Sequence, residues 1–249
     1  MLKEERFEVI LKELQAKKVV KFEELAILLD ISEDTVRRDI DFLHRNGLLS
    51  KARGGAMLRE KDPLNFQDRK SFSTKEKDII ALKTQAFIKS GMTIFIDGGT
   101  TLMAVVNNMP LDIKLRIITN NLSLIPIVER FKNVEIVVLG GNYDYQLGIS
   151  HGITTCNEIP KYIADLYIMG TCAVDAKFGI TAISISDGEA KKMMQKCAKK
   201  TIALANDSKL NYTEAFKVSD IQDIKALITN LDSNSPDLDS FRNLGIQIV

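Results

Sequence analysis

Short, continuous apolar runs alternate with helix-like segments over the last two thirds of this 249-residue chain. Ile94-Phe95-Ile96 and Ile136-Val137-Val138-Leu139 are two such runs without any polar alternation. A strand that is covered on both faces shows this pattern, whereas a strand with one wet face alternates polar and apolar residues. The pattern therefore predicts an α/β domain built on a mainly parallel sheet.

The expected elements of this domain follow one another along the chain. Apolar runs predict strands near 92–97, 115–119, 134–139, 165–169, 201–205 and 226–229. Helical spacing predicts helices near 101–109, 122–131, 187–199 and 219–225. A Ser followed three residues later by Glu or Gln has the spacing of a capping box. Such boxes stand at Ser73–Glu76, Ser186–Glu189 and Ser219–Gln222.

The first 60 or so residues have a different pattern, with three short amphipathic helices followed by a basic, glycine-containing stretch. Ser32 is expected to cap the third helix, which ends near Gly47. The stretch from Leu48 to Met57 is typical of a β-hairpin, or wing. We therefore expect an α+β two-domain chain: a winged helix-turn-helix over residues 1–58, a linker over 59–73, and the α/β domain over 74–249.

Composition excludes several classes of protein. The chain has 34 Lys and Arg against 33 Asp and Glu, and 45% of its residues are hydrophobic, so it is neither disordered nor a highly basic nucleic-acid coat protein. It has no apolar run of about 18 residues and no apolar leader, which predicts a cytoplasmic protein without a membrane partner. Three cysteines without metal-like spacing and two histidines predict no metal site, no cofactor and no Ser-His-Asp triad.

The third helix and the wing carry the residues expected at DNA. Thr35, Arg37 and Arg38 project from the exposed side of the helix, and an arginine fork can bind a guanine edge or a phosphate. Lys51 and Arg53 in the wing are placed to hold the DNA backbone or the minor groove. An alternative is that Arg37 and Arg38 only solvate the helix and pair with Asp34 or Asp41. The order of helices and wing favours DNA binding.

Small and polar residues follow four of the expected strands. In a parallel sheet these positions meet at the carboxyl edge, where ligands bind. Asp97-Gly98-Gly99-Thr100-Thr101 also opens a helix, so that its glycines, hydroxyls and helix amides suit an anion. The other strand-end residues in this prediction are Thr119, Asn120, Asn121, Gly140, Gly141, Gly170, Asp175, Gly179 and Thr181.

Two parts of the chain resemble the DeoR family of bacterial transcriptional regulators. The N-terminal part does so through Ser32-Glu33-Asp34-Thr35-Val36-Arg37-Arg38-Asp39 and Arg53-Gly54-Gly55-Ala56. This resemblance implies that Ser32, Thr35, Arg37 and Arg38 lie at the DNA, with Arg53 and Gly54 in the wing. Asp39 would orient Arg38 or the wing, because a carboxylate is repelled by phosphates.

The C-terminal part resembles the DeoR-family effector domain, whose fold is similar to ribose-5-phosphate isomerases and CoA-transferases. The matching pieces are Ile96–Thr101, Thr119–Asn121, Leu139–Gly141, Ala164-Asp165, Gly170, Asp175, Gly179–Thr181, Glu189-Ala190 and Ala205–Lys209. The chain departs from the family at Asn206, where Asp is usual, and at the insert Tyr143-Asp144-Tyr145.

This second resemblance implies a phosphorylated sugar as effector and a homo-oligomeric repressor, dimeric or tetrameric, of a sugar-metabolism operon. Thr100 and Thr101 would hold the phosphate. Asp97, Asn120, Asp175 and Glu189 would bind sugar hydroxyls, and Lys209 would make a second anion contact or a loop ion pair.

Several of these residues have a simpler structural interpretation. Asp97 could cap the helix that starts near Thr101, Asp175 could form a turn, and Lys209 could be a solvated lysine. A sugar-phosphate isomerase-like enzyme also stays open as an alternative, with Asp175 and Glu189 as acid and base. Against it, the glycine- and lysine-rich catalytic segment of those isomerases is not visible after Asp175, and a plain enzyme has no use for a DNA-binding module.

Overall fold

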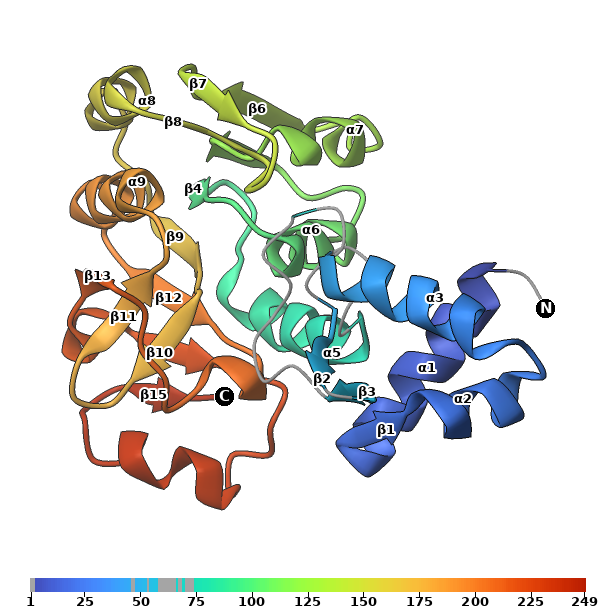
Figure 1. Cartoon of the computed structure of the whole chain (residues 1–249). Helices are drawn as coiled ribbons and strands as arrows, with labels where there is room; N and C mark the ends of the chain where they lie inside the picture. The colour runs from blue at the N-terminus through green and yellow to red at the C-terminus, as the bar shows by residue number, and fades with distance from the viewer. Residues whose placement is uncertain (1–2, 46–47, 53, 58–65, 67–68, 70–73) are drawn as a thin grey trace. The chain divides into compact units, whose positions relative to one another are not determined.

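The computed structural model describes residues 3–45, 48–52, 54–57, 66, 69 and 74–249 (Figure 1). The chain divides into two compact units, Met1–Phe72 and Ser73–Val249. The predicted linker at 59–73 lies almost wholly outside the described residues, as does Ser73 of the first expected capping box.

The first unit has three helices and a small antiparallel sheet. Its elements are α1 (Lys3–Lys17), β1 (Val19–Lys21), α2 (Phe22–Leu29), α3 (Glu33–Arg45), β2 (Ser50–Ala52) and β3 (Gly55–Met57). The strand order is β1-β3-β2. Ile10, Val36, Ile40 and Leu43 are fully buried among the three helices. The winged helix-turn-helix arrangement expected from the sequence is therefore confirmed.

Local chemistry fixes the start of α3 and the pairing of β3 with β1. Ser32 Oγ accepts the Thr35 amide at 3.3 Å, which satisfies one of the donors left open at the start of α3. Gly55 lies so close to β1 that a Cβ there would stand 2.0 Å from the Val20 carbonyl oxygen. Only glycine allows β3 to pair with β1 at this distance.

The second unit is built on a seven-stranded, fully parallel sheet with the order β15-β14-β12-β9-β4-β5-β6. Its strands are β4 (Thr93–Ile96), β5 (Leu115–Thr119), β6 (Val134–Val138), β9 (Leu166–Gly170), β12 (Thr201–Leu204), β14 (Ala226–Ile228) and β15 (Gln247–Ile248). The six strands predicted from apolar runs are confirmed to within one residue at each end. The short final strand β15 was not predicted.

Both faces of the sheet are covered (Figure 1). One face packs against α5 (Thr74–Thr84), α6 (Thr100–Asn107) and α7 (Ile125–Val128). The other packs against α9 (Ile185–Lys196) and a small antiparallel sheet of β10 (Ala173–Asp175), β11 (Gly179–Ala182) and β13 (Phe216–Ser219). Along β4, Ile94 and Ile96 face the first layer and Phe95 faces the second, as the period of a strand requires.

Three helix predictions need correction. The segment 122–131 is a 3-10 turn (Leu122–Leu124) followed by the short α7. The expected helix 219–225 is only a 3-10 turn (Ile221–Asp223), because Ser219 pairs with Ile180 as the last residue of β13. Helix α9 begins at Ile185, one residue before Ser186, with Ser184 as its N-cap, so the capping box at Ser186–Glu189 is wrong.

Besides β15, the small antiparallel sheet of β10, β11 and β13 was not predicted, and neither was the segment after β6. After β6 the chain forms an antiparallel hairpin of β7 (Asn142–Asp144) and β8 (Ile149–His151), followed by α8 (Ile153–Glu158). Residues 142–151 are called the β7–β8 hairpin below.

We expect that a substitution in the core of the first unit lowers the stability of that unit and leaves the second unit folded. Replacing the fully buried Leu43 with Ala should cost about 2–5 kcal/mol, because it leaves a cavity among the three helices. Hydrogen exchange should then speed up at the amides of α1 to α3 and stay unchanged in β4 and β5. The exposed Glu8→Ala is the matched control, and equal acceleration in both units would contradict the expectation.

Candidate functional site

The first turns of α3 present their polar side chains as expected. Val36 and Ile40 are fully buried, whereas Arg37 and Arg38 are exposed and Thr35 is partly exposed. The hydroxyls of Ser32 and Thr35 lie 2.9 Å apart, so the two side chains form one polar pair at the start of the helix. This surface can contact DNA through two guanidinium groups and a hydroxyl pair.

Arg37 is paired with a carboxylate other than those expected. Its Nη2 lies 3.3 Å from Oε2 of Glu33, one turn earlier, and its guanidinium stands 5.1 Å from the centre of the Phe22 ring. Both side chains of the ion pair are about half exposed, and such pairs contribute little to stability. Arg37 can therefore exchange Glu33 for a phosphate or base at low cost.

Asp39 has a different role from the one expected. Its carboxylate accepts Arg6 Nε at 2.7 Å and Arg6 Nη2 at 3.2 Å, and only 3% of the residue is exposed. This fork joins α1 to α3 inside the unit. The prediction that Asp39 orients Arg38 or the wing is thus wrong, since its carboxylate faces α1.

The wing contributes one described cation. Lys51 in β2 pairs with Asp41 of α3, which ties the wing to the helix. Gly54 makes the turn with φ +79° and its carbonyl accepts the Phe22 amide at 3.0 Å. Arg53, the other wing residue predicted at DNA, lies outside the described residues.

In the second unit, the sheet reverses its strand order between β4 and β9. After β4 the chain adds β5 and β6 on one side and then returns to add β9, β12 and β14 on the other. In open α/β sheets, ligands bind outside the carboxyl ends of the strands at such a point. Asp97, Gly98 and Gly99 follow β4 there, and Gly170 ends β9 beside them: a Cβ on Gly170 would stand 2.9 Å from the Gly98 carbonyl oxygen.

Asp97 is the centre of a buried polar network at this point. It is 1% exposed, its Oδ1 accepts the Gly170 amide at 2.8 Å, and its Oδ2 accepts the Tyr167 hydroxyl at 2.5 Å. The Lys191 ammonium from α9 donates to the same Oδ2. Both carboxylate oxygens are therefore engaged by the protein, and Asp97 does not cap α6.

Lys191 was missed by the sequence analysis. Besides Asp97, its ammonium donates to the Gly170 carbonyl at 3.0 Å and lies 3.5 Å from Oδ1 of Asp187. Burial raises the pKa of Asp97, although Lys191 opposes this effect. Burial alone would lower the pKa of Lys191, but Asp187 and Asp97 outweigh it and raise the pKa above its usual value. Lys191 is therefore a charged ammonium between two carboxylates.

The start of α6 is open to an anion. Its N-cap residue is Gly99, with φ +138°, and no side chain caps the helix. The first amides of a helix lack partners within the helix, and together with the helix dipole they favour a negative group. Thr100 is mostly buried, and Gly98, Gly99 and Thr101 are partly exposed.

The polar residues at the end of β5 and just after it lie beside this loop. Thr119 Oγ1 accepts the Asn121 amide at 2.9 Å, and the Asn121 side chain donates to the Gly99 carbonyl at 3.4 Å. Asn120 is fully buried, and its Nδ2 donates to the Ser150 carbonyl at 2.9 Å. Its Oδ1 is buried without a hydrogen-bond partner among the described residues. This orphaned acceptor is suited to a hydroxyl donor.

Other predicted effector residues have their polar atoms engaged elsewhere. Asp175 Oδ1 accepts the amides of Lys177 and Phe178, both at 2.8 Å, and so forms the turn between β10 and β11. In the same hairpin, Gly179 has φ +79° and Thr181 Oγ1 accepts the Glu214 amide at 2.8 Å. Glu189 is exposed on α9 and pairs with Lys192 at 3.3 Å.

The remaining strand-end residues also have contacts within the protein. Gly140 donates its amide to Glu158 Oε2 at 2.8 Å, and Gly141 packs beside Thr155 with φ +135°. Lys209 Nζ donates to the Thr171 carbonyl at 2.9 Å. Asn206, where the family usually has Asp, is mostly buried with an Oδ1 that has no partner among the described residues.

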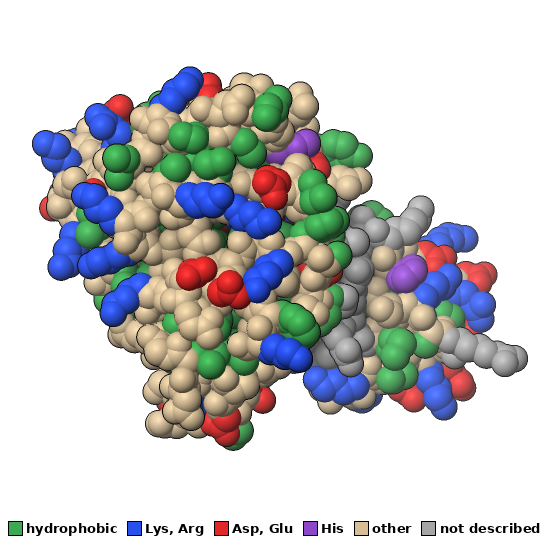
Figure 2. Space-filling model, turned by 90° about the vertical axis from the view of Figure 1, so that its left-hand side faces the viewer, with side chains coloured by type: hydrophobic (Ala, Val, Ile, Leu, Met, Phe, Trp, Pro, Cys, Tyr) green, Lys and Arg blue, Asp and Glu red, His purple; other side chains and the backbone are tan. Residues whose placement is uncertain are grey.

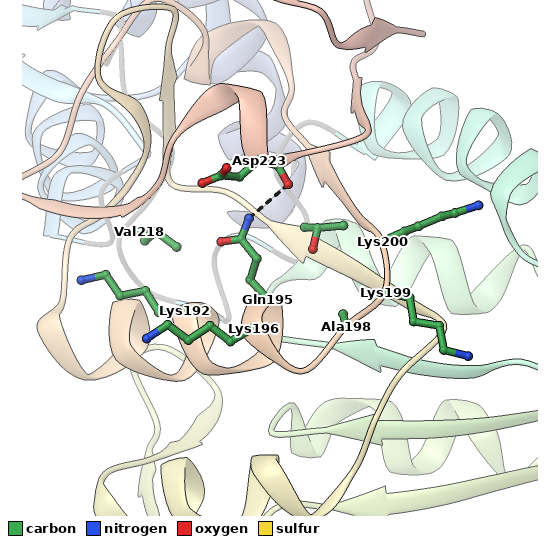
Figure 3. A pocket seen from close by; sticks show the side chains of 9 residues that line it. Lys192, Gln195, Lys196, Ala198, Lys199, Lys200, Val218 and Asp223 are labelled. Atoms are coloured by element: carbon green, nitrogen blue, oxygen red, sulfur yellow. Dashed lines mark hydrogen bonds between the residues drawn. The ribbon is translucent and has the colours of Figure 1, made fainter.

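A hollow of about 510 Å³ lies at the amino end of β12, beside Thr201 and the last turn of α9 (Figure 3). Its lining includes Lys192, Lys196, Lys199 and Lys200. Lys192 pairs with Glu189, and Lys199 pairs with Asp165 at 2.8 Å. Figure 2 shows lysine and arginine side chains distributed over the visible face of the second unit. This hollow shares none of its lining residues with the Asp97–Thr101 loop.

Two further properties bear on function. Among the described helices, none has the length and apolar character needed to cross a bilayer. The residues that the structure describes contain no group of three or more His, Cys, Asp or Glu side chains placed to hold a metal ion.

The network around Lys191 generates a stability prediction. Lys191→Met should destabilise the second unit by about 3–5 kcal/mol, because it leaves the Asp97 carboxylate buried without its cation. The double variant Asp97→Asn/Lys191→Met should lose less than the sum of the two single losses. Urea denaturation followed by circular dichroism checks both, and a Lys191→Met protein as stable as the original chain would contradict the assignment.

Comparison with known proteins agrees with both units. Residues 6–62 match the family model of the DeoR-like helix-turn-helix domain, and residues 73–231 match that of the DeoR C terminal sensor domain. The glycerol-3-phosphate regulon repressor of Haemophilus influenzae is 30% identical over 225 residues, which cover 90% of this chain and 88% of the relative. The HTH-type transcriptional repressor GlcR of Bacillus subtilis is 28% identical over 255 residues, 100% of this chain and 96% of the relative.

Among solved structures, a ribose 5-phosphate isomerase A from Methanocaldococcus jannaschii is similar with a TM-score of 0.40 and 15% identity, over 54% of this chain and 53% of the isomerase. That similarity carries no conclusion about activity. The two family models together span both units, and the H. influenzae relative matches nine tenths of the sequence. The chain therefore belongs to the DeoR family of transcriptional regulators.

Proposed function

We propose that this chain is a cytoplasmic repressor of a sugar-metabolism operon, controlled by a phosphorylated sugar. Residues 1–58 bind double-stranded operator DNA, 59–73 link the two parts, and 74–249 bind the effector and form the homo-oligomer. The observation that carries the effector part is the uncapped start of α6 at the point where the strand order reverses. The names of the two full-length relatives, both repressors, support the regulatory part.

On the DNA side, α3 is the recognition helix. Arg37 and Arg38 read base edges or hold phosphates, with the Ser32–Thr35 pair and Lys51 beside them. Paired half-sites in an operator require at least two copies of the recognition helix, so the repressor acts as a dimer or a larger homo-oligomer.

On the effector side, the amides at the start of α6 and the hydroxyls of Thr100 and Thr101 hold the phosphate. Asn120 Oδ1 accepts a sugar hydroxyl. Asp97 positions this loop, since its two oxygens already bind Gly170, Tyr167 and Lys191. The effector acts by binding the DNA-competent and DNA-incompetent arrangements with different affinity.

An isomerase-like enzyme fits the structure less well. Asp175 and Glu189 were the candidate acid and base, and general acid–base catalysis needs both groups within reach of one substrate. One oxygen of Asp175 is held by two turn amides, and Glu189 is exposed beside Lys192. We therefore favour a regulator without enzymatic activity.

The DNA assignment predicts a loss of affinity in one variant. Arg38→Ala should weaken binding to an operator obtained by selection from random duplexes, by about 1–3 kcal/mol if Arg38 reads a base. Fluorescence anisotropy at fixed salt measures the loss. Lys12→Ala, an exposed lysine on α1, is the control and should bind as the unmodified chain does. Unchanged affinity in both Arg37→Ala and Arg38→Ala would overturn the recognition-helix assignment.

The effector assignment predicts a variant that loses the response to the sugar phosphate and still binds the operator. Thr100→Glu should abolish the rise in Tm that a sugar phosphate produces, because a carboxylate at the start of α6 occupies and repels the anion position. Operator affinity without effector should be unchanged. Thr100→Ser keeps the hydroxyl and serves as the control. A full Tm response in Thr100→Glu would place the phosphate elsewhere.

A further inference from the structure

We propose that the β7–β8 hairpin is the roof of the effector site, and that the site retains a ligand only while residues 149 and 150 of the hairpin are docked on Gly98 and Asn120. This inference rests on the function proposed above and adds residues that neither the motifs nor the family comparison assign. Of the insert Tyr143-Asp144-Tyr145, Asp144 forms the turn of this hairpin, and both tyrosines are exposed.

The first observation is the contact between Ile149 and the Gly98 loop. Ile149 is 1% exposed, and a Cβ on Gly98 would stand only 2.2 Å from Ile149 Cγ2. The isoleucine side chain therefore lies directly on the backbone of Gly98, one residue from the N-cap of α6. Glycine is required at position 98 as long as the hairpin is docked.

The second observation is the hydrogen bonding between the hairpin and the end of β5. The Ser150 amide donates to the Asn120 carbonyl at 2.8 Å, and Asn120 Nδ2 donates back to the Ser150 carbonyl at 2.9 Å. Asn121 and Ile149 form an isolated antiparallel bridge next to them. The hairpin is thus fixed to the site by both its backbone and one apolar side chain.

The third observation is the orphaned oxygen of Asn120. Because Nδ2 is held by Ser150, Oδ1 of the same amide has a fixed direction, and it is buried without a partner among the described residues. A buried acceptor without a donor is destabilising. A hydroxyl of a phosphorylated polyol supplies the donor while its phosphate binds at α6, and both contacts form only when Ser150 orients Asn120.

The hairpin has a fixed turn and is flanked by a glycine with positive φ on each side. Asp144 Oδ1 accepts the amides of Gln146 and Leu147 at 2.8 and 3.1 Å, which fixes the turn. Glycines with positive φ stand at both ends, Gly141 at +135° and Gly152 at +99°. Among the described residues, the hairpin strands pair with each other, and the bridge at Asn121 is the strand pairing that joins them to the rest of the unit. Release of the hairpin would break this bridge, the two Asn120–Ser150 hydrogen bonds and the Ile149–Gly98 contact.

The test uses the full chain and three variants: Gly98→Ala, Ile149→Ala and the double variant. The added methyl of Gly98→Ala must push Ile149 away, whereas Ile149→Ala makes room for it. Tyr145→Ala changes an exposed side chain of the hairpin and is the matched control. The probes are inorganic phosphate and a panel of sugar phosphates with their unphosphorylated parents. Titration calorimetry gives Kd, and hydrogen exchange reports on the Ser150 amide.

We expect the tightest sugar phosphate to slow exchange of the Ser150 amide in the unmodified chain. Gly98→Ala should speed this exchange and weaken sugar-phosphate binding by about tenfold or more, and the double variant should recover most of the binding. Tyr145→Ala should match the unmodified chain. Loss in Gly98→Ala without recovery in the double variant would show that the methyl blocks the anion directly, and would overturn the roof.

Two other outcomes separate this inference from the proposed function. If a sugar phosphate binds the unmodified chain but leaves Ser150 exchange unchanged, the effector site stands and the roof is overturned. If no sugar phosphate in the panel binds, the proposed effector function fails and the roof fails with it.

Discussion

A single buried ammonium holds together the part of the sheet that carries the Asp97–Thr101 loop. Lys191 binds Asp97 after β4, the carbonyl of Gly170 at the end of β9, and Asp187 one turn earlier on its own helix. Charges in a dry interior are costly unless they are paired and hydrogen-bonded, so this cluster tolerates few alternative arrangements. Strands β4 and β9 already pair with each other, and the ammonium holds the loop after β4 against the end of β9, where Gly98 lies beside Gly170.

The parallel sheet could be predicted from the sequence because burial on both faces leaves a direct mark, the continuous apolar run. The sequence also located the loop at Asp97–Thr101 and the polar residues after β5. It did not predict Lys191, since a lysine on a helix with polar neighbours has the pattern of a solvated surface residue. Its burial follows from Asp97, which lies 94 residues away in the chain.

The β7–β8 hairpin was missed for a related reason. Tyr143 and Tyr145 are exposed, and the segment has neither a strand nor a helix period. Its position depends on contacts with Asn120 and Gly98, which local sequence does not reveal. Asp175 shows the opposite error: a polar residue after a strand was assigned to a ligand, whereas the structure uses it for a turn, the alternative that the sequence also allowed.

The clamp between Arg6 and Asp39 has a consequence for the electrostatics of DNA recognition. Helix α3, the proposed recognition helix, carries four carboxylates, at Glu33, Asp34, Asp39 and Asp41. Asp39 is neutralised inside the unit by Arg6, while Asp41 is paired with Lys51 and Glu33 with Arg37. To reach DNA in the proposed arrangement, Arg37 and Lys51 must leave these half-exposed carboxylates, which offsets part of the attraction to the phosphates. We therefore expect the affinity to fall less steeply with salt than the number of Arg and Lys residues would indicate.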